Sequence, residues 1–398
     1  MKKKILYLCH RIPYPPNKGD KIRSFNEIKY LSKNNTIDLI TLADEPEDLK
    51  YTENLKKYCR QVKVFSLNKT IGKLKGFISL LSGKSISQGY FYQRRFQSTF
   101  NQWINREQYD SIICFSSPMA EYVFKGSKKI SDISDNFIMD FCDLDSDKWL
   151  QYSQKTKFPI DIIYKKEANR LLNFEKKINQ KFSKSIFISE AEANLFKVKH
   201  FTAKDIQIIP NGVDYKYFDS DKTKITKKFS SPMLVFPGAM DYHANIDGVK
   251  WFTKEIFPEI KKKIPEIKFY IVGSNPAPSI KALESDKSII VTGFVKDIRE
   301  YYKAASVCVI PLRIARGVQN KVLESMSMKN AVLSTSQAVQ GINPEVKKAL
   351  KIEDDPNGFA SKTLDLINNR SKRKQLGTQA RNFILKHHNW NKNLENLF

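Results

Sequence analysis

A basic loop between a predicted strand and a predicted helix carries the side chains best suited to chemistry. The strand is a short run of mostly β-branched residues at 307–310, and the helix after it is predicted to begin near Gly317. The charged residues and the glycine of this stretch are Arg313, Arg316, Gly317, Lys321 and Glu324. Free backbone N–H groups, the positive end of a helix dipole and cationic side chains would meet there. Together they predict an anion site suited to a phosphate.

Lys321 and Glu324 lie on one face of the predicted helix, about one turn apart. At that spacing Lys321 can reach the same anion, and the Glu324 carboxylate can accept hydrogen bonds from a sugar diol. An ordinary surface ion pair between the two side chains also fits the spacing, because such pairs are common on helices and weak. The spacing alone leaves both interpretations open.

The composition is that of a globular chain long enough for two domains. Of its 398 residues 41% are apolar, and no run of about 18 apolar residues occurs that would predict a membrane-spanning helix. The five cysteines are odd in number and widely spaced, which favours a reduced, cytoplasmic protein without disulfides or a Cys-x-x-Cys metal site. The net charge of +26 fits a nucleic acid, an anionic membrane or an acidic substrate as partner, or a compositional bias of the genome.

Two series of short apolar runs alternate with helical patterns along the chain. These runs lie at 5–9, 37–42, 62–66 and 111–115, and then at 233–236, 268–272, 289–291 and 307–310. Such alternation predicts βαβ units, and hence an α/β fold with two Rossmann-like, doubly wound parallel-sheet domains. The predicted domains are 1–205 and 231–385, with an interdomain linker at 206–230.

The loop after the first predicted strand is rich in proline and ends in Lys18, Gly19 and Asp20. Gly19 permits close approach of the backbone, and Asp20 is placed to cap the helix that follows. The first βα turn of a doubly wound domain lies at the carboxyl edge of the sheet, where ligands bind. A stiff connector with a capped helix is the alternative interpretation.

An acidic loop follows another predicted strand near 138–142. Its aspartates at alternate positions resemble a calcium loop, but the glycine and the glutamate required at the sixth and twelfth positions are missing. Calcium binding is therefore not predicted. Asp143 and Asp145 are candidates for a base or an orienting group beside an attacking hydroxyl. Capping of the next helix by Asp145 or Ser146 is the alternative.

Three motifs resemble those of family 4 glycosyltransferases, which have the GT-B fold. They are Pro-Tyr-Pro-Pro-Asn-Lys-Gly-Asp-Lys-Ile-Arg at 13–23, Asn-Gly-Val-Asp at 211–214 and Lys-Val-Leu-Glu-Ser-Met at 321–326. The first motif, and the Leu-Arg-Ile-Ala-Arg-Gly loop before the third, are similar to those of the exopolysaccharide-associated sugar transferases. The resemblance implies two Rossmann-like domains facing a cleft, with the acceptor on the first and a nucleotide sugar on the second. It also implies that the closing helix, 386–398, packs back on the first domain.

The resemblance implies roles for single residues. Lys321 would bind the donor pyrophosphate and Glu324 the nucleotide ribose, while Arg316 stands where many members have a second Glu that contacts the donor sugar. Asp143 follows Cys142, at the place where many members have a His-Asp pair. The expected catalytic set is Arg316, Lys321, Glu324 and Asp143. The other expected donor contacts are Gly19, Gly238, Met240, Gly293, Phe294, Arg313 and Gly317. The expected acceptor contacts are Asn17, Lys18, Asp20, Arg23 and Asp145.

The activity implied by the resemblance is sugar transfer from a nucleotide-diphosphate sugar to a glycan or lipid-linked acceptor. The family's reaction retains the anomeric configuration and uses no metal or other cofactor, and the subgroup implies synthesis of exopolysaccharide or another cell-surface polysaccharide. Two alternatives stay open: a nucleotide-sugar epimerase of the same fold, and a basic membrane- or nucleic-acid-binding module without turnover. A nicotinamide oxidoreductase is disfavoured, because no Gly-x-Gly-x-x-Gly follows either first strand.

Residues 69–84 predict a helix whose apolar residues and lysines could segregate onto two faces. Such a helix could rest on anionic lipid. A core-facing helix with a solvated basic side is the alternative. The basic and aromatic character continues to residue 103, and residues 51–100 carry ten Lys and Arg against one Asp or Glu. The stretch 69–103 is therefore the predicted place of peripheral contact with the inner face of a membrane, and no specific nucleic acid is expected as partner.

Overall fold

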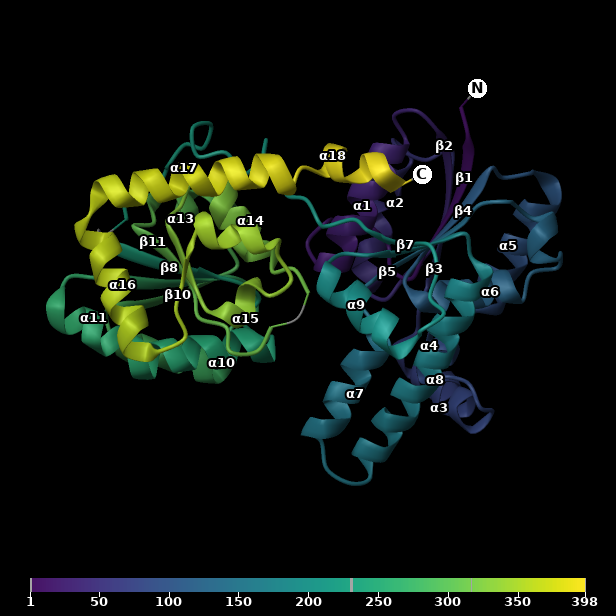
Figure 1. Ribbon diagram of the computed structural model, residues 1–398, viewed down its shortest axis with the longest axis horizontal. Coiled ribbons are helices and arrows are strands. Elements are labelled where there is room, and N and C mark those ends of the chain that lie inside the picture. Colours follow the sequence, from purple (N-terminus) through teal and green to yellow (C-terminus); the bar gives the residue numbers. More distant parts are fainter. Residues whose placement is uncertain (1, 230–231, 316, 398) are drawn as a thin grey trace. The chain divides into compact units, whose positions relative to one another are not determined.

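The computed structural model describes residues 2–229, 232–315 and 317–397 and consists of two compact units, Met1–Ile209 and Pro210–Phe398 (Figure 1). The boundary between the units falls within the stretch 206–230. Arg316, one of the expected catalytic residues, lies outside the described residues.

The amino-terminal unit is built on a seven-stranded sheet in the order β3-β2-β1-β4-β5-β6-β7, with all neighbouring strands parallel. Its strands are β1 (Lys4–Cys9), β2 (Thr36–Ala43), β3 (Gln61–Ser66), β4 (Ser111–Phe115), β5 (Phe137–Cys142), β6 (Lys184–Phe187) and β7 (Ile206–Ile208). Its helices are α1 (Gly19–Leu31), α2 (Thr52–Leu55), α3 (Lys69–Leu81), α4 (Ile86–Phe91), α5 (Arg94–Arg106), α6 (Ala120–Phe124), α7 (Asp145–Lys155), α8 (Ile160–Lys181) and α9 (Glu190–Lys199). The strand order reverses between β1 and β4.

The carboxyl-terminal unit repeats this plan with a six-stranded parallel sheet in the order β10-β9-β8-β11-β12-β13. Its strands are β8 (Met233–Pro237), β9 (Lys268–Val272), β10 (Ile289–Gly293), β11 (Val307–Ile310), β12 (Val332–Ser334) and β13 (Lys351–Ile352). Its helices are α10 (His243–Trp251), α11 (Phe257–Lys263), α12 (Pro278–Lys281), α13 (Arg299–Ala304), α14 (Asn320–Ser327), α15 (Ser336–Val339), α16 (Pro356–Asn368), α17 (Arg370–His387) and α18 (Trp390–Leu394). Figure 1 shows α14 and α17 along one face of this sheet and α10 and α11 along the other.

Both sheets form where the apolar runs predict strands. Strands β1, β4, β8 and β11 are buried along nearly their whole length, as strands of a parallel sheet must be when helices cover both faces. The predicted α/β class with doubly wound parallel sheets is therefore confirmed. No described helix combines the length and the apolar composition needed to traverse a lipid bilayer.

Candidate functional site

Three glycines stand at the carboxyl ends of neighbouring strands in the carboxyl-terminal unit. Gly238 follows β8, Gly273 follows β9, and Gly293 ends β10. A Cβ atom on Gly273 would overlap the carbonyl oxygen of Gly238, and the Gly273 N–H donates to the carbonyl oxygen of Gly293 at 3.2 Å. The strand ends thus pack backbone against backbone, beside the point where the strand order reverses between β8 and β11. Ligands of doubly wound sheets bind at that point.

Lys321, in the first turn of α14, reaches this edge of the sheet. Its Nζ donates a hydrogen bond to Oδ1 of Asn245 on α10 and lies 4.7 Å from the centroid of the Phe236 ring. A Cβ atom on Gly238 would lie 3.1 Å from the same Nζ. Asn245 also donates from Nδ2 to the carbonyl oxygen of Ala239 at 2.8 Å, so one side chain orients both the lysine and the loop after β8. Burial lowers the pKa of Lys321 to about 7, although the charge of Glu324 acts in the opposite direction.

Glu324 lies one turn further along α14 and is held by a tyrosine from α13. Tyr302, which is fully buried, donates from Oη to Oε2 of Glu324 at 3.0 Å. Burial raises the pKa of Glu324 to about 7, against the lowering effects of the Tyr302 hydrogen bond and the Lys321 charge. The two predicted residues therefore take partners from α10 and α13, and burial shifts their pKa values toward each other. Titratable groups that burial perturbs at a ligand-binding edge are candidates for function.

The loop between β11 and α14 is more constrained than the sequence indicates. Arg313 donates from Nε and Nη2 to the two carboxylate oxygens of Asp247 at 3.1 and 2.5 Å, and its guanidinium lies 5.6 Å from the centroid of the Trp251 ring. Gly317 has a left-handed backbone with φ of 61°, and its carbonyl oxygen would overlap a Cβ atom on Gly341. Helix α14 begins at Asn320, so the predicted start near Gly317 is wrong. The positive end of the helix therefore lies directly before Lys321.

Phe294 and Met240 occupy opposite environments in this unit. Phe294 directly follows β10 and is 82% exposed, which leaves an aromatic face available at the carboxyl edge of the sheet. Met240 is fully buried in the hydrophobic core, and its N–H donates to the carbonyl oxygen of Ser274 at 2.8 Å. Met240 thus turns its side chain into the core and presents only its backbone in the loop after β8.

The first loop of the amino-terminal unit is organised around Asp20, which does not cap α1. The cap position is Lys18, whose side chain makes no capping hydrogen bond, so that prediction is wrong. The Asp20 carboxylate instead accepts from Nη1 of Arg11 at 2.8 Å and lies 3.5 Å from Nε2 of His10. Burial alone would raise the pKa of Asp20, but the hydrogen bonds and charges of His10 and Arg11 outweigh it and lower the pKa well below its usual value. Asn17, Lys18 and Gly19 are exposed beside this cluster.

Arg23 lies beneath the same loop and is buried. Its guanidinium donates to Asp140 on β5 at 2.7 Å from Nε, to the carbonyl oxygen of Ile209 at 2.8 Å from Nη1, and approaches Glu27 at 3.1 Å. Tyr7 on β1 donates to the other oxygen of Glu27 at 2.6 Å, and burial raises the pKa of Glu27 well above its usual value. Arg23 thus ties α1 to β5 and to the end of β7, and its side chain does not face solvent.

Asp143 and Asp145 follow β5 at the carboxyl edge of the amino-terminal sheet, and both are partly exposed. The cap position of α7 is Leu144, so neither Asp145 nor Ser146 occupies it and the capping alternative is wrong. Acceptors come from other helices, because the N–H groups of Leu144 and Ser146 donate to Glu192 at 2.7 Å and to Glu175 at 3.2 Å. Asp145 therefore lies in the first turn of α7 and not at its cap position.

The described structure brings Lys321, Glu324, Gly238 and Gly293 to one sheet edge of the carboxyl-terminal unit, and the loops with Asp20, Asp143 and Asp145 to one sheet edge of the other. Sequence reasoning missed Asn245 and Tyr302, which hold the Lys321–Glu324 pair, and the His10–Arg11 cluster around Asp20. No local pattern marks Asn245 or Tyr302, because each meets its partner from a distant part of the chain. The role of Gly273 could have been predicted, because Gly273 directly follows a predicted strand just as Gly238 does.

Comparison with known proteins adds to this geometry. Residues 231–369 match the family model described as "Glycosyl transferases group 1". A protein from Klebsiella pneumoniae described as "Uncharacterized 44.6 kDa protein in cps region" is 22% identical over 412 residues, covering 99% of each chain. Among solved structures, the sucrose-phosphate synthase from Thermosynechococcus elongatus aligns with a TM-score of 0.69 at 14% identity, over 100% of this chain and 97% of its own. Anabaena Alr3699/HepE, solved in complex with UDP and glucose, aligns with a TM-score of 0.65 at 13% identity, over 99% and 98%.

These similarities define the fold as GT-B, and the fold predicted from the sequence is confirmed. The residues that match the group 1 glycosyltransferase model lie in the carboxyl-terminal unit, and Lys321 and Glu324 at the switch point are among them. The expectation of a glycosyltransferase is confirmed at the level of this domain.

Proposed function

We propose that the protein is a family 4 glycosyltransferase that moves a sugar from a nucleotide-diphosphate sugar to a glycan or lipid-linked acceptor. We further propose that the reaction retains the anomeric configuration, needs no metal and serves the synthesis of a cell-surface polysaccharide. The relative from a cps region supports the last point. The observation that carries the proposal is the Lys321–Glu324 pair, partly buried at the switch point of the matched domain.

The donor would lie along the carboxyl ends of β8, β10 and β11. The diphosphate would sit between Lys321 and the amino terminus of α14, where a cation and free N–H groups favour negative charge. Glu324, oriented by Tyr302, would accept from the ribose hydroxyls, and Phe294 would stack on the base. As the bond to the sugar breaks, negative charge grows on the leaving diphosphate, and donors that are already in position stabilise it without reorganisation.

Two arginines would complete the donor site. Arg316 belongs to it by its place in the sequence. Arg313 would join it by exchanging its ion pair with Asp247 for the diphosphate. That exchange is feasible because half of the Arg313 side chain is exposed and an exposed ion pair contributes little.

The acceptor would bind on the amino-terminal unit. Asp143 and Asp145 present carboxylates after β5, and Asn17 and Lys18 are exposed in the first loop. A carboxylate there can orient an attacking hydroxyl or accept its proton. We also propose that the protein contacts the inner face of the membrane, and the large apolar side chains exposed on α3 of the same unit support a membrane contact.

The proposal is tested first by thermal unfolding with UDP, GDP, ADP, CMP and dTDP, with UDP as the leading candidate because of the HepE complex. A nucleotide at about 100 times its dissociation constant should add about 2.7 kcal/mol to the free energy of unfolding. The gain should be lost in Glu324→Ala and retained in Glu266→Ala, an exposed glutamate of the same unit. If no nucleotide raises the free energy of unfolding, the proposed donor site is rejected and the alternative of a binding module without turnover is favoured.

Turnover then separates the remaining alternatives. With the nucleotide identified, the matching nucleotide sugars are incubated with the protein, with and without a membrane extract as source of acceptor. A transferase releases nucleotide diphosphate and extends the acceptor, whereas an epimerase gives an altered free sugar without any acceptor. Lys321→Ala should lower transfer by on the order of 10²–10³-fold, as the loss of one preorganised donor does elsewhere.

A further inference from the structure

Helix α3 turns its small residues and Leu80 inward and most of its large apolar residues outward. Gly72, Gly76 and Ser79 are buried against α4. Five large apolar side chains face solvent, each more than half exposed: Ile71, Leu74, Phe77, Ile78 and Leu81. The alternative of a core-facing helix with a solvated basic side is therefore wrong.

The packing of α3 on α4 fixes this orientation. A Cβ atom on Gly76 would lie 2.7 Å from the Ile86 side chain, and one on Gly89 would lie 2.5 Å from the carbonyl oxygen of Lys75. No larger side chain fits this interface, so α3 cannot turn its apolar face toward α4. Helix α8 is hydrogen-bonded to both helices. Arg170 donates to the carbonyl oxygen of Leu80 on α3, and Glu167 accepts from the N–H groups of the first two residues of α4.

The exposed face of α3 has the charge pattern of an interfacial helix. At about 100° per residue the five apolar side chains fall within an arc of about 120°, with Lys73 and Lys75 at its two borders. From Glu53 to Glu107 the chain contains eleven Lys and Arg and no further acidic residue. An apolar stripe bordered by lysines, in an acid-free segment, is complementary to an anionic lipid surface.

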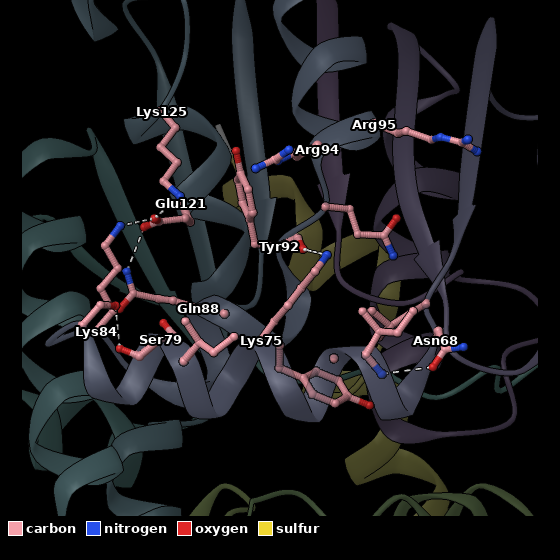
Figure 2. A pocket seen from close by; sticks show the side chains of 18 of the residues that line it. Asn68, Lys75, Ser79, Lys84, Gln88, Tyr92, Arg94, Arg95, Glu121 and Lys125 are labelled. Carbon is pink, nitrogen blue, oxygen red and sulfur yellow. Dashed lines mark hydrogen bonds and ion pairs between the residues drawn. The ribbon is translucent and has the colours of Figure 1, made fainter.

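A basic pocket of about 750 Å³ borders the same helix, between α3, α4, the start of α5 and α6 (Figure 2). The cationic residues of its lining are Lys75, Lys84, Arg94, Arg95 and Lys125. Among the described lining residues only Glu121 is acidic, so the pocket has an excess of four positive charges. The rim contributed by α3 includes Ile71 and Ile78, which belong to the exposed apolar face.

The single carboxylate cannot balance these cations. Figure 2 shows Lys84 and Lys125 extending to Glu121, at 2.6 and 3.1 Å from its Oε1. Arg94 and Arg95 form the first turn of α5, where the cap position makes no side-chain hydrogen bond and no acidic residue is present. Cations at the positive end of a helix repel its dipole, and an anion in the pocket would relieve that repulsion.

We propose that the exposed face of α3 and this pocket together bind the surface of an anionic phospholipid membrane. The apolar side chains of α3 enter the boundary between headgroups and acyl chains, and the phosphate of one lipid lies in the pocket. This membrane surface lies on the amino-terminal unit, whereas the proposed donor site lies on the carboxyl-terminal unit. Nucleotide binding therefore tests the donor site alone, and vesicle binding tests the membrane surface alone.

Sedimentation of the full chain with vesicles tests the apolar contact. The protein should bind vesicles of phosphatidylcholine with phosphatidylglycerol, and bind phosphatidylcholine alone much more weakly. Leu74→Ser with Phe77→Ser should weaken binding at least about tenfold, since each side chain would lose its transfer from water to lipid. The control is Val198→Ser with Phe201→Ser, two exposed apolar residues of the same unit, which should bind as the unaltered chain does.

Charge variants test the pocket. Arg94→Ser with Arg95→Ser should weaken binding to anionic vesicles by about 25-fold, from about fivefold for each charge near an anionic surface. Lys165→Ser with Lys166→Ser removes the same charge from exposed positions of α8 and should have a clearly smaller effect. Equal losses in the two pairs would show that the pocket is not a lipid-phosphate site and would overturn that half of the proposal.

A tryptophan reporter makes the test independent of loss of folding. The chain has four tryptophans of its own, so the emission of the unaltered chain is subtracted from that of Leu74→Trp, and the difference should shift to the blue with anionic vesicles because the added ring leaves water. Unchanged emission would overturn the proposal. The same would follow if the Leu74 and Phe77 double variant still bound vesicles while Phe158→Ser, at the exposed tip between α7 and α8, lost binding. It would also be overturned if inorganic phosphate or duplex DNA bound the pocket while anionic vesicles did not.

Discussion

Lys321 is the residue whose proton should report nucleotide binding most directly. Burial lowers the pKa of its ammonium to about 7, and the neighbours of Nζ are the amide oxygen of Asn245 and the ring of Phe236. A diphosphate beside Nζ would bring negative charge and return the pKa toward its ordinary value of 10.5. Above pH 7 the free protein would then take up a proton as it binds the nucleotide.

The size of the effect follows from that pKa. A group with a pKa of about 7 is about half protonated at pH 7 and about 1% protonated at pH 9, so the affinity should fall by up to about 50-fold, or about 2.3 kcal/mol. This is an upper limit, because Lys321 is partly exposed and solvent screens its charge. Below pH 7 the sign reverses, since Glu324, whose pKa burial raises to about 7, becomes protonated and no longer accepts from a diol as a carboxylate.

Calorimetric titration with UDP between about pH 7 and pH 9, in two buffers of different ionisation heat, measures both affinity and proton uptake. Uptake should approach one proton at the alkaline end, while the dissociation constant rises. Lys321→Met should bind weakly at every pH and lose the alkaline decline, whereas Lys262→Met, an exposed lysine of the same unit, should retain it. An affinity independent of pH over this range, or the same decline in Lys321→Met, would refute the reasoning.

Three further substitutions test the supports of the two sheet edges. Tyr302→Phe removes the hydrogen bond to Glu324 and should lower the free energy of unfolding by about 1–2 kcal/mol, measured in urea, and weaken UDP binding; an unchanged UDP affinity would exclude its orienting role. Arg23→Met leaves Asp140 buried without its counter-charge and should cost about 3–5 kcal/mol in the same assay; a cost below about 1 kcal/mol would contradict the buried pair. Gly273→Ala places a Cβ atom on the loop after β8 and should abolish stabilisation by UDP; a normal thermal shift would show that the tight packing of the strand ends is dispensable.

The fold could be predicted from the sequence because its strands are continuous apolar runs. A strand buried on both faces needs no alternation, so runs such as 5–9 and 307–310 mark β1 and β11 directly. The residues at which helices begin, and the residues that cap them, were harder to predict. Asp20 has the right type to cap a helix that begins at Lys21, but α1 begins two residues earlier, at Gly19, and Arg11 and His10, from the loop after β1, bind the Asp20 carboxylate. Local propensity cannot anticipate a partner that tertiary packing brings in.

The orientation of α3 shows a second limit. Periodicity indicates that apolar residues and lysines occupy different faces of the helix, but it does not say which face meets the protein. The structure decides this through Gly72, Gly76 and Gly89, whose missing side chains let α3 and α4 approach closely. Glycines repeated at helical spacing on the side opposite the apolar residues were present in the sequence, and they mark the packed face.

Spacing alone could not decide between a surface ion pair and a donor site for Lys321 and Glu324. An exposed pair of this kind would leave both pKa values near those of free side chains, because water screens the interaction. Here burial pushes the lysine toward its neutral form and the glutamate toward its protonated form, each to about 7, while Asn245 and Tyr302 fix their orientation. Holding two such groups partly out of water costs stability in the free protein. A ligand that brings a diphosphate to one and a diol to the other would recover that cost, and this is the physical argument for a nucleotide-sugar donor at this edge.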